Sequence, residues 1–495
     1  MAGQIADYRA VFISGKLNRD IEYFKNLFKK DAFLRIKEIK SRNGTPIDCA
    51  LLFMDGMSNS ERITESITKP LITVKTDTEI KDLADYIDKR ILFANDVKKV
   101  KNVADILTGI LYGEALLLID KSETALLLDV KGFPTRGFTE PQEERILAGP
   151  REGFEEQSLK NLSALRRKLL TPDLCIEPMR VGRRTSTAVY VCYLESLCDK
   201  KLVKAVKEKI QSINIDGILD TNYIVEQISE NRFSLFKTNG STERPDIVAA
   251  RLLEGRVAIM VDGTPIVATV PYLFSENFQS DEDYYQNFLL SSAERILRWF
   301  CFFLSISTPG LFIALSTFHR EFLPTEFAMS VMHLRGGVPF TPVTECLVMI
   351  LVFEILREAG IRMSQNLGHA LSIVGGLVVG QAAVDARIIS SPILIIVALS
   401  GIAGLMLPRL KTAILYLRIV FVLISAALGL YGYLCGGILL LLYILSLNSY
   451  SSDYTVSLNK ANFQSLKDTF LRASWRNMKE RPHFNKNIVR KGTRK

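Results

Sequence analysis

Hydrophobic and polar residues alternate in two different ways along the chain, and the change falls near residue 290. Before it, apolar runs of about four to eight residues are bounded by charged or turn-forming residues, a pattern typical of strands and amphipathic helices. After it come apolar segments of 14 to 20 residues with few charges. The pattern predicts an α/β region followed by an all-α multi-pass transmembrane region.

Six apolar segments make up the second region, at residues 296–315, 343–356, 366–384, 388–407, 412–430 and 433–447. A helix needs roughly 20 residues to cross the core of a bilayer. The second segment is short and carries two carboxylates, so it either crosses or re-enters. We expect five or six crossings and favour six, because six puts the first region and the C-terminal tail on the same side. A tight helical hairpin between the last two segments is predicted by Gly429, Gly432, Gly436 and Gly437.

The first region contains a weak internal repeat. LLFMDGM at 51–57 corresponds to VCYLESL at 191–197, and GEALLLID at 113–120 corresponds to GRVAIMVD at 255–262. Each copy reads strand, charged helix, further helix and β-hairpin, and the second hairpin has a two-residue Asp262–Gly263 loop, a strong hairpin signal. The repeat predicts two similar α/β subdomains. A cleft between them would suit ligand capture or partner docking, and a scaffold without ligand is the alternative.

These signals divide the chain into five parts. They are a first α/β subdomain (1–130), a linker rich in Gly, Pro and charge that turns helical from Glu156 (131–172), a second α/β subdomain (173–290), a transmembrane region of five or six helices (291–450) and a basic cytoplasmic tail (451–495).

Composition and charge sharpen this division. The chain is 48% hydrophobic and 23% charged overall, but only 14 of the 152 residues from Trp299 to Tyr450 are charged. The net charge of +9 is concentrated after residue 450, where eleven Lys and Arg face three Asp and Glu. Such a tail predicts a cytoplasmic location and contact with membrane lipid. Nucleic-acid binding is not expected, because no recognised fold or aromatic platform accompanies the tail.

The start of the chain and its cysteines favour a cytoplasmic first region. The first twenty residues contain five charges and no long apolar run, so no secretory signal is predicted. The seven cysteines form no CxxC pair, which argues against a disulfide framework or a zinc site.

Charged residues inside the apolar segments are candidate functional residues because they are costly in a membrane. Glu345, Glu354, Arg357 and Glu358 lie in or beside the second segment, and the last three share one helix face. They form either a helix end at the head groups or a polar stripe that faces a protein interior or a water-filled path. Arg418, in the fifth segment, is expected to snorkel.

The third segment is rich in small residues. Gly368, Gly375, Gly376 and Gly380 include a GxxxG pair, which predicts close helix packing within or between subunits. The alternative is a pore lining in an oligomer, with Gln381 and Asp385 near one mouth.

Enzyme signatures are missing from the sequence. The four histidines form no HExxH, and no GxSxG elbow, Walker A loop or GxGxxG follows a predicted strand. We therefore predict a protein without catalytic activity, cofactor or metal.

Several long motifs resemble one family. They are TRGFTEPQEERILAGPREGFEEQSLKNLSALRRKL, TERPDIVAARLLEGRVAIMVDGTP, QSDEDYYQNF, VPFTPVTECLVMILVFEILREAGIRM and LGHALSIVGGLVVGQAAVDA. These motifs are similar to the A subunits of the GerA family of spore germinant receptors. The linker motif of that family covers Arg136, Glu140, Pro141, Gly149, Pro150, Arg151 and Glu152. Ser364 departs from the family pattern, which tends to have proline there.

The resemblance implies a multi-pass subunit of the spore inner membrane with a cytoplasmic N-terminal region. Its partners would be a permease-like B subunit, thought to bind the nutrient germinant, and a lipoprotein C subunit. Germinant binding would trigger release of monovalent cations and dipicolinic acid. Our leading hypothesis is a signalling subunit that forms a homo-oligomer and gates or forms an ion channel. The alternative is a transporter component or a passive scaffold for the permease-like subunit.

Overall fold

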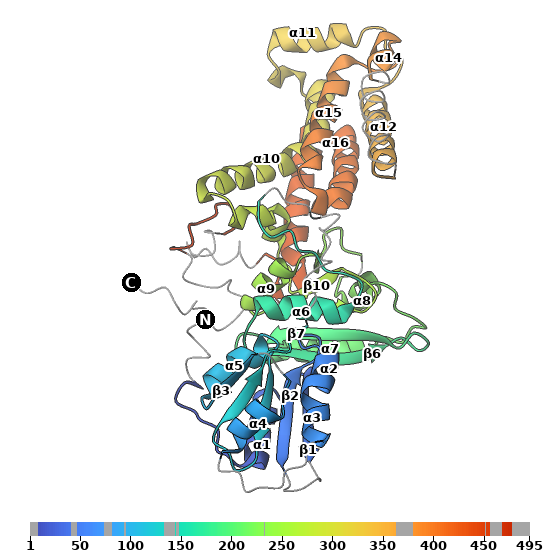
Figure 1. The fold of residues 1–495 in the computed structure, drawn as a ribbon. Coiled ribbons are helices and arrows are strands. Elements are labelled where there is room, and N and C mark those ends of the chain that lie inside the picture. The colour runs from blue at the N-terminus through green and yellow to red at the C-terminus, as the bar shows by residue number, and fades with distance from the viewer. Residues whose placement is uncertain are drawn as a thin grey trace.

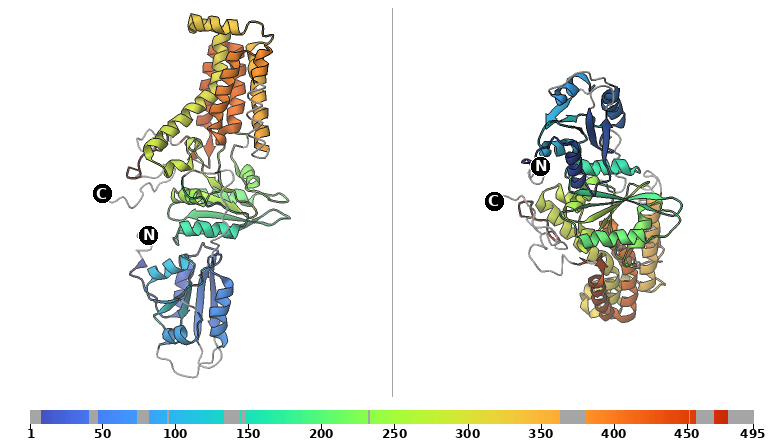
Figure 2. Two further views of the ribbon diagram at one scale, coloured as in Figure 1. Left: turned by 45° about the horizontal axis from the view of Figure 1, so that its top comes forward. Right: turned by 90° about the horizontal axis from the view of Figure 1, so that it is seen from below.

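The protein is described by a computed structural model of the 495-residue chain. The structure describes residues 8–40, 47–73, 82–93, 96–132, 144, 148–231, 233–362, 380–450, 452–455 and 468–477. Three parts follow one another along its length: two α/β subdomains and a helical bundle (Figures 1 and 2).

The first subdomain is a five-stranded sheet covered by helices on both faces. Its elements are α1 (Leu17–Leu27), β1 (Leu34–Lys40), β2 (Asp48–Met54), α2 (Ser60–Arg62), η2 (Ile63–Thr68), α3 (Lys69–Thr73), α4 (Leu83–Arg90), β3 (Val97–Val100), α5 (Val103–Leu111), β4 (Ala115–Ile119) and β5 (Ala125–Leu128). The strand order is β1-β2-β4-β5-β3, with antiparallel pairs throughout. Phe24 and Ile106 pack on one face, and Ile67 and Ile87 pack on the other. Every residue of β4 is therefore buried, which explains its continuous apolar run.

The second subdomain repeats this arrangement. Its elements are α6 (Ser158–Lys168), β6 (Leu174–Val181), β7 (Thr187–Leu194), α7 (Lys200–Gln211), α8 (Thr221–Ile228), β8 (Gly240–Thr242), α9 (Pro245–Leu253), β9 (Val257–Val261) and β10 (Val267–Val270). The order β6-β7-β9-β10-β8 matches the first sheet strand for strand. The internal repeat is confirmed, and it extends to the helices, because α6 packs on its sheet beside α9 as α1 packs beside α5.

The second hairpin is confirmed, but the predicted two-residue loop is wrong. The last residues paired between these strands are Met260 and Val267, so the connection between β9 and β10 comprises residues 262–266. Pro265 has no amide hydrogen to continue the ladder. Asp262 is also engaged elsewhere, because its carboxylate accepts from the Ser158 amide (3.0 Å) and hydroxyl (2.6 Å).

The two subdomains are joined by a buried ion pair. An Arg166 Nη2 atom on α6 lies 2.6 Å from an Asp31 carboxylate oxygen, just before β1. Both side chains are almost fully buried. Nearby, the amide of Ala32 donates to the carbonyl of Ile176 on the edge strand β6 (3.4 Å). This contact fixes the first subdomain against the edge of the second sheet.

The helical region begins after η3 (Phe274–Phe278) and η4 (Asp281–Tyr284). It comprises α10 (Phe288–Ile313), η5 (Ala314–Phe318), η6 (Arg320–Phe322), α11 (Thr325–Leu334), α12 (Pro342–Arg362), α14 (Gly380–Asp385), α15 (Ser391–Leu405), η8 (Pro408–Leu410) and α16 (Lys411–Ser446), followed by the short strands β11 (Asn448–Ser449) and β12 (Ser452–Asp453). Two stretches of the described chain, Phe288–Phe318 and Pro408–Ser446, are long and apolar enough to cross a membrane, and Ser391–Leu405 is a shorter apolar helix. Most of the predicted third segment lies outside the described residues.

The predicted hairpin between the last two segments is confirmed within α16. Gly429 has φ 61° and ψ −143°, which breaks the helix at that residue. The rings of Phe421 and Tyr433 lie only 5.6 Å apart, although a straight helix would separate residues twelve positions apart by about 18 Å. The chain therefore reverses at Gly429, and both halves of α16 run along the bundle (Figure 1).

Candidate functional site

An aromatic cluster fixes the bundle on the second subdomain. Phe278 on η3 stacks on Trp299 of α10 with ring centroids 3.6 Å apart, and Phe274 meets both rings edge-on. Tyr454, which follows α16, packs against Phe274 and donates from its hydroxyl to the carbonyl of Lys237 (2.8 Å). Both ends of the helical region, the start of α10 and the chain after α16, therefore meet at one place on this subdomain. We call this place the joint.

Buried charges surround the aromatic cluster. The carboxylate of Asp283 accepts hydrogen bonds from Arg295 (3.0 and 3.1 Å) and from Arg298 (2.9 and 3.0 Å). Arg295 also pairs with Asp468, far along the chain, at 2.9 Å. Burial raises the pKa of the Asp468 carboxyl above its ordinary value, and Arg295 opposes that shift. The network thus ties α10 to the C-terminal segment.

A second network joins the hairpin of the second sheet to η3. The Arg256 guanidinium donates to Glu276 (2.6 Å) and to the carbonyl of Pro271 (2.9 Å). Glu276 also pairs with Arg251, and Arg256 pairs with Glu254 at 2.9 Å. Arg256 and Glu276 are almost fully buried. Burial lowers the pKa of Arg256 to about 10, the direction expected for a cation removed from water.

Arg409 connects the turn between α15 and α16 to the joint. Its guanidinium donates to the carbonyls of Glu276 and Gln279, both at 3.2 Å. It also pairs with Asp281 (3.4 Å) and with Glu144 (3.5 Å). A third connection of the bundle therefore reaches the same part of the second subdomain.

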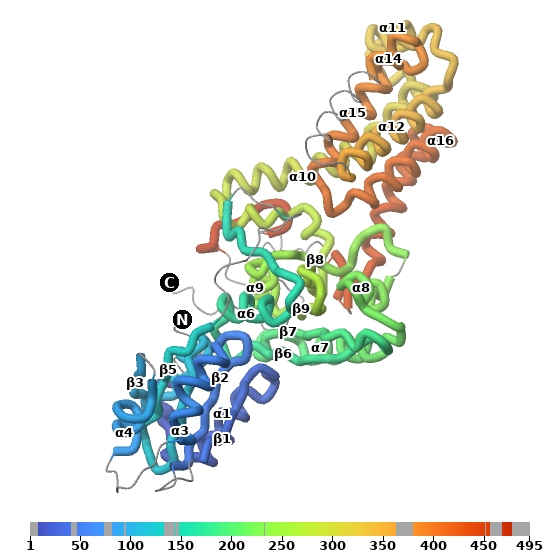
Figure 3. Tube along the Cα trace, turned by 45° about the vertical axis from the view of Figure 1, so that its right-hand side comes forward, coloured from blue at the N-terminus to red at the C-terminus, as the bar shows by residue number. Residues whose placement is uncertain are grey.

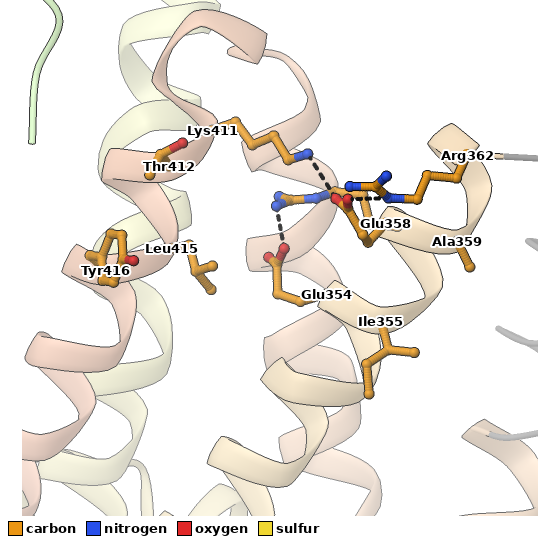
Figure 4. Close-up of a pocket in the computed structure, with 10 residues that line it drawn as sticks. Glu354, Ile355, Glu358, Ala359, Arg362, Lys411, Thr412, Leu415 and Tyr416 are labelled. Atoms are coloured by element: carbon orange, nitrogen blue, oxygen red, sulfur yellow. Dashed lines mark hydrogen bonds and ion pairs between the residues drawn. The ribbon is translucent and has the colours of Figure 1, made fainter. Parts of the chain in front are cut away.

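Charged side chains also cluster where α12 ends and α16 begins, around a cavity of about 540 Å³ (Figure 4). Glu354 pairs with Arg357, and Glu358 pairs with Arg362 (2.8 Å) and Lys411 (3.4 Å). The first pair is mostly buried, whereas Glu358 and Arg362 are exposed. The residues that were predicted to share a stripe thus divide into an inner pair and an outer group.

Arg418 lies behind the inner pair, and the expectation that it snorkels is wrong. Its side chain is buried and donates to the Ser305 carbonyl (3.2 Å) and hydroxyl (3.0 Å) and to the Ser400 carbonyl (3.0 Å). The Glu354 carboxylate lies 4.0 Å away. Arg418 therefore links α10, α12, α15 and α16 through one guanidinium.

Comparison with known proteins decides the family. The family model described as Bacillus/Clostridium GerA spore germination protein matches residues 22–484. The chain belongs to the GerA family. Spore germination protein KA of Bacillus subtilis (strain 168) is 37% identical to it, over 96% of this chain and 87% of that protein. Spore germination protein GerLA of Bacillus cereus is 33% identical, over 95% and 97%. The chain therefore has a role in spore germination.

A solved structure is also similar. It is the N-terminal domain of the A subunit of the Bacillus megaterium spore germinant receptor GerK3, with 28% identity and a TM-score of 0.43. The match covers 53% of this chain and 97% of that one.

The described part of the GerA linker motif contacts the second subdomain. The Pro150 carbonyl accepts from Arg244 (3.1 Å), and the Glu152 carboxylate pairs with Lys168 (3.0 Å). Gly149 has a φ of 124°, which favours glycine, and Arg151 is exposed. Arg136, Glu140 and Pro141 lie outside the described residues.

The other predicted residues of this GerA chain are placed as follows. The structure brings Glu345 to the opposite end of α12 from Glu354, where it accepts from the Ser390 amide (2.8 Å) and pairs with Arg335 (3.4 Å). On α14, Gly380 is buried, whereas Gln381 and Asp385 are exposed. Gly368, Gly375 and Gly376 lie outside the described residues. Among the described residues, no group of three or more His, Cys, Asp or Glu side chains could hold a metal ion.

The joint itself was missed from the sequence. Some of its charges, Asp281, Asp283, Arg251 and Arg256, lie in QSDEDYYQNF and TERPDIVAARLLEGRVAIMVDGTP, which were noted only as family motifs. Their spacing gave no sign of their partners, because Arg295 and Asp468 are separated by 173 positions.

Proposed function

We propose that the chain is the A subunit of a spore germinant receptor and crosses the spore inner membrane with its α/β region in the cytoplasm. It acts with a permease-like B subunit and a lipoprotein C subunit. Germinant binding in the complex is converted into ion release, by a homo-oligomer of this chain that forms or gates an ion channel. Support for the partners comes from membership of the GerA family and from relatives such as spore germination protein KA of Bacillus subtilis.

The positions of the two ends of the bundle support an even number of crossings, as in the six-crossing arrangement. The chain enters the bundle from the second subdomain at α10, and after α16 Tyr454 packs against that subdomain again. A region whose two ends return to one side crosses the membrane an even number of times. The reversal at Gly429 supplies the last pair of crossings.

The observation that carries signal transmission is the joint. Three connections of the bundle, at Trp299, Arg409 and Tyr454, converge on η3 and its surroundings. A displacement of the second subdomain therefore moves α10, the α15–α16 turn and the end of α16 together. Such a shared attachment would let the bundle switch between two arrangements as a unit, with the balance between them set by ligand binding to a partner subunit.

The test replaces the connection that is remote from both chain ends. Spores that carry Arg409→Met should assemble the receptor at normal membrane levels, as judged by immunoblot, yet lose nutrient-triggered cation release by at least about tenfold, a coupling of about 1.4 kcal/mol. Arg362→Met is the matched control, because Arg362 is exposed at the end of α12. Normal germination of assembled Arg409→Met receptors would contradict the proposal.

Current recording separates a channel from a scaffold. Purified chain in planar bilayers should carry cation currents, and Arg418→Met should change them because Arg418 links four helices. Intact oligomers that remain electrically silent would favour a scaffold or a transporter component.

A further inference from the structure

The first half of α10 is oriented in the opposite way to a helix on a water-exposed surface. Its charged residues Arg295 and Arg298 turn inward to Asp283. Its outward face carries exposed apolar side chains: Leu289, Leu290, Ile296, Leu297 and Phe300. In a soluble protein the charged face of an amphipathic helix meets water and the apolar face is buried. The outward face of α10 therefore requires an apolar neighbour.

A second apolar patch lies in the loop between α8 and β8. Phe233 is 100% exposed, and Leu235 is partly exposed. The Leu235 amide donates to the Tyr443 hydroxyl (3.0 Å), close to the end of α16. This places the loop beside the end of the bundle that meets the second subdomain. Figures 1 and 3 show α8 and α10 on opposite sides of that end.

We propose that these two patches insert into the interfacial layer of the membrane leaflet that faces the α/β subdomains. The occupant of both is lipid. The apolar face lies at the start of the stretch Phe288–Phe318, which comprises α10 and η5 and is long and apolar enough to cross a membrane. Trp475 and Arg476, in the segment that packs beside α10, are exposed.

The composition of the C-terminal tail also fits a lipid surface. Eleven Lys and Arg against three acidic residues follow position 450. Aromatic and basic side chains beside an apolar helix face are typical of elements at the head-group layer. The second subdomain would thus rest on the bilayer at two points, on either side of the bundle. If the second subdomain tilted, the bilayer would hold it at these two points, and the motion would be transmitted to the joint.

The experiment measures the depth of single probes in the full chain. Leu290→Cys and Phe233→Cys carry an environment-sensitive fluorophore, in a background with Cys301→Ala and Cys435→Ala, the two partly exposed thiols. The protein is placed in phosphatidylcholine–phosphatidylglycerol vesicles with lipid that carries a nitroxide near its head group. Phe93→Cys is the matched control, because Phe93 is exposed and lies just after α4 of the first subdomain, which Figure 1 shows far from the bundle.

We expect the nitroxide to quench both probes at least about twofold more than the control, because interfacial side chains lie about 5–10 Å into the head-group boundary. Equal quenching at positions 93, 233 and 290 overturns the inference. So does a cross-link between two copies through Leu290→Cys with no lipid quenching, since a second chain would then cover the face.

Because this inference rests on the proposed membrane location, a fourth probe separates the two. Ile438→Cys lies on the exposed side of α16. Its quenching by a nitroxide deep in the acyl chain, without quenching at 233 and 290, overturns the interfacial contact alone. Absence of lipid quenching at all four positions overturns the membrane location as well.

Discussion

The two α/β subdomains share one fold but are used differently. Their sheets have the same strand order, and their helices cover equivalent faces. After β5, the first copy leads into the linker, whereas after β10 the second copy leads into η3, η4 and α10. Among the described residues, the joint to the bundle is built on the second copy. The two copies thus share an architecture, and in the described structure the bundle is attached to the second copy.

Equivalent positions show how the copies diverged. Glu114 follows Gly113 before β4, and Arg256 follows Gly255 before β9. Glu114 pairs with Lys98 (3.4 Å) and Lys131 (3.0 Å) on its own subdomain. Arg256 instead reaches Pro271 and Glu276, at the exit toward the bundle. The buried residue before the strand is thus acidic in the first copy, where it contacts nearby lysines, and basic in the second copy, where it contacts the connection to the bundle.

The helix starts before these strands differ in the same sense. Asn102 begins α5 and caps it, because its side-chain oxygen accepts from the Ala104 amide (2.7 Å). Arg244 takes the equivalent place before α9 and reaches Asp246 (2.7 Å) and the Pro150 carbonyl (3.1 Å). Asn102 also holds the N-terminal segment, because its amide donates to the Arg9 carbonyl (3.0 Å), whereas Arg244 holds the linker.

The largest effect should come from Arg256→Met. This change leaves the buried Glu276 carboxylate without one of its cations and the Pro271 carbonyl without its donor. Removal of one partner from a buried ion pair costs about 3–5 kcal/mol. Hydrogen exchange in β9 and β10 of the full chain should therefore accelerate by about two to four orders of magnitude, while β4 and β5 keep their rates.

Glu114→Gln is the matched variant on the first subdomain. The amide can still accept from Lys98 and Lys131, which are partly exposed, so we expect a change within about 1 kcal/mol. If Glu114→Gln and Arg256→Met accelerated exchange in their own sheets equally, this position would not account for the difference between the two copies.

A smaller effect is expected where the copies meet. Arg166→Met removes the only cation that the described structure places on the buried Asp31 carboxylate, but the Phe33 amide remains as a donor to it (3.0 Å). We expect a loss of about 3 kcal/mol, the lower end for a broken buried pair. The measurement is exchange of the α6 amides. Lys30→Met is the control: it breaks the neighbouring exposed pair with Glu195 and should cost less than about 1 kcal/mol. A larger loss for Lys30→Met than for Arg166→Met would show that the exposed pair, and not the buried one, holds the two subdomains together.

Local patterns allowed the fold of the first region to be predicted. The repeat of 140 to 142 positions, the continuous apolar strands and the Asp262–Gly263 signal all describe contacts between residues close in sequence or between copies of one unit. The hairpin at Gly429 was predictable for the same reason, because glycine accepts the positive φ found there.

The joint could not be predicted, because its pairs connect remote parts of the chain. Asp468 was one of three acidic residues in a basic tail, and only the fold brings it to Arg295. Arg418 shows the same limit: aliphatic neighbours in the sequence suggested snorkelling, whereas the packed bundle offers it the oxygens of Ser305 and Ser400. A charge that tertiary structure satisfies cannot be recognised from its neighbours in the sequence.

The smallest effect concerns a pair on the outer strand of the second sheet. Burial disfavours the charged Glu177 carboxylate, but Lys207 (2.5 Å) and the Tyr193 hydroxyl (2.5 Å) outweigh it and hold its pKa below the ordinary value of 4.5. A lowered pKa stabilises the fold above pH 4.5, and this contribution is lost as the pH falls through the folded pKa. Glu177→Gln should therefore cost less than about 1 kcal/mol at neutral pH and nothing once the carboxyl is protonated.

The reaction of buried Cys192 with dithiodipyridine in urea reports this unfolding at both pH values, and Cys49 reports the first subdomain. Glu38→Gln, on the equivalent strand β1, is the control; an equal loss at acidic pH for Glu177→Gln would show that the side chain acts through packing and not through its charge.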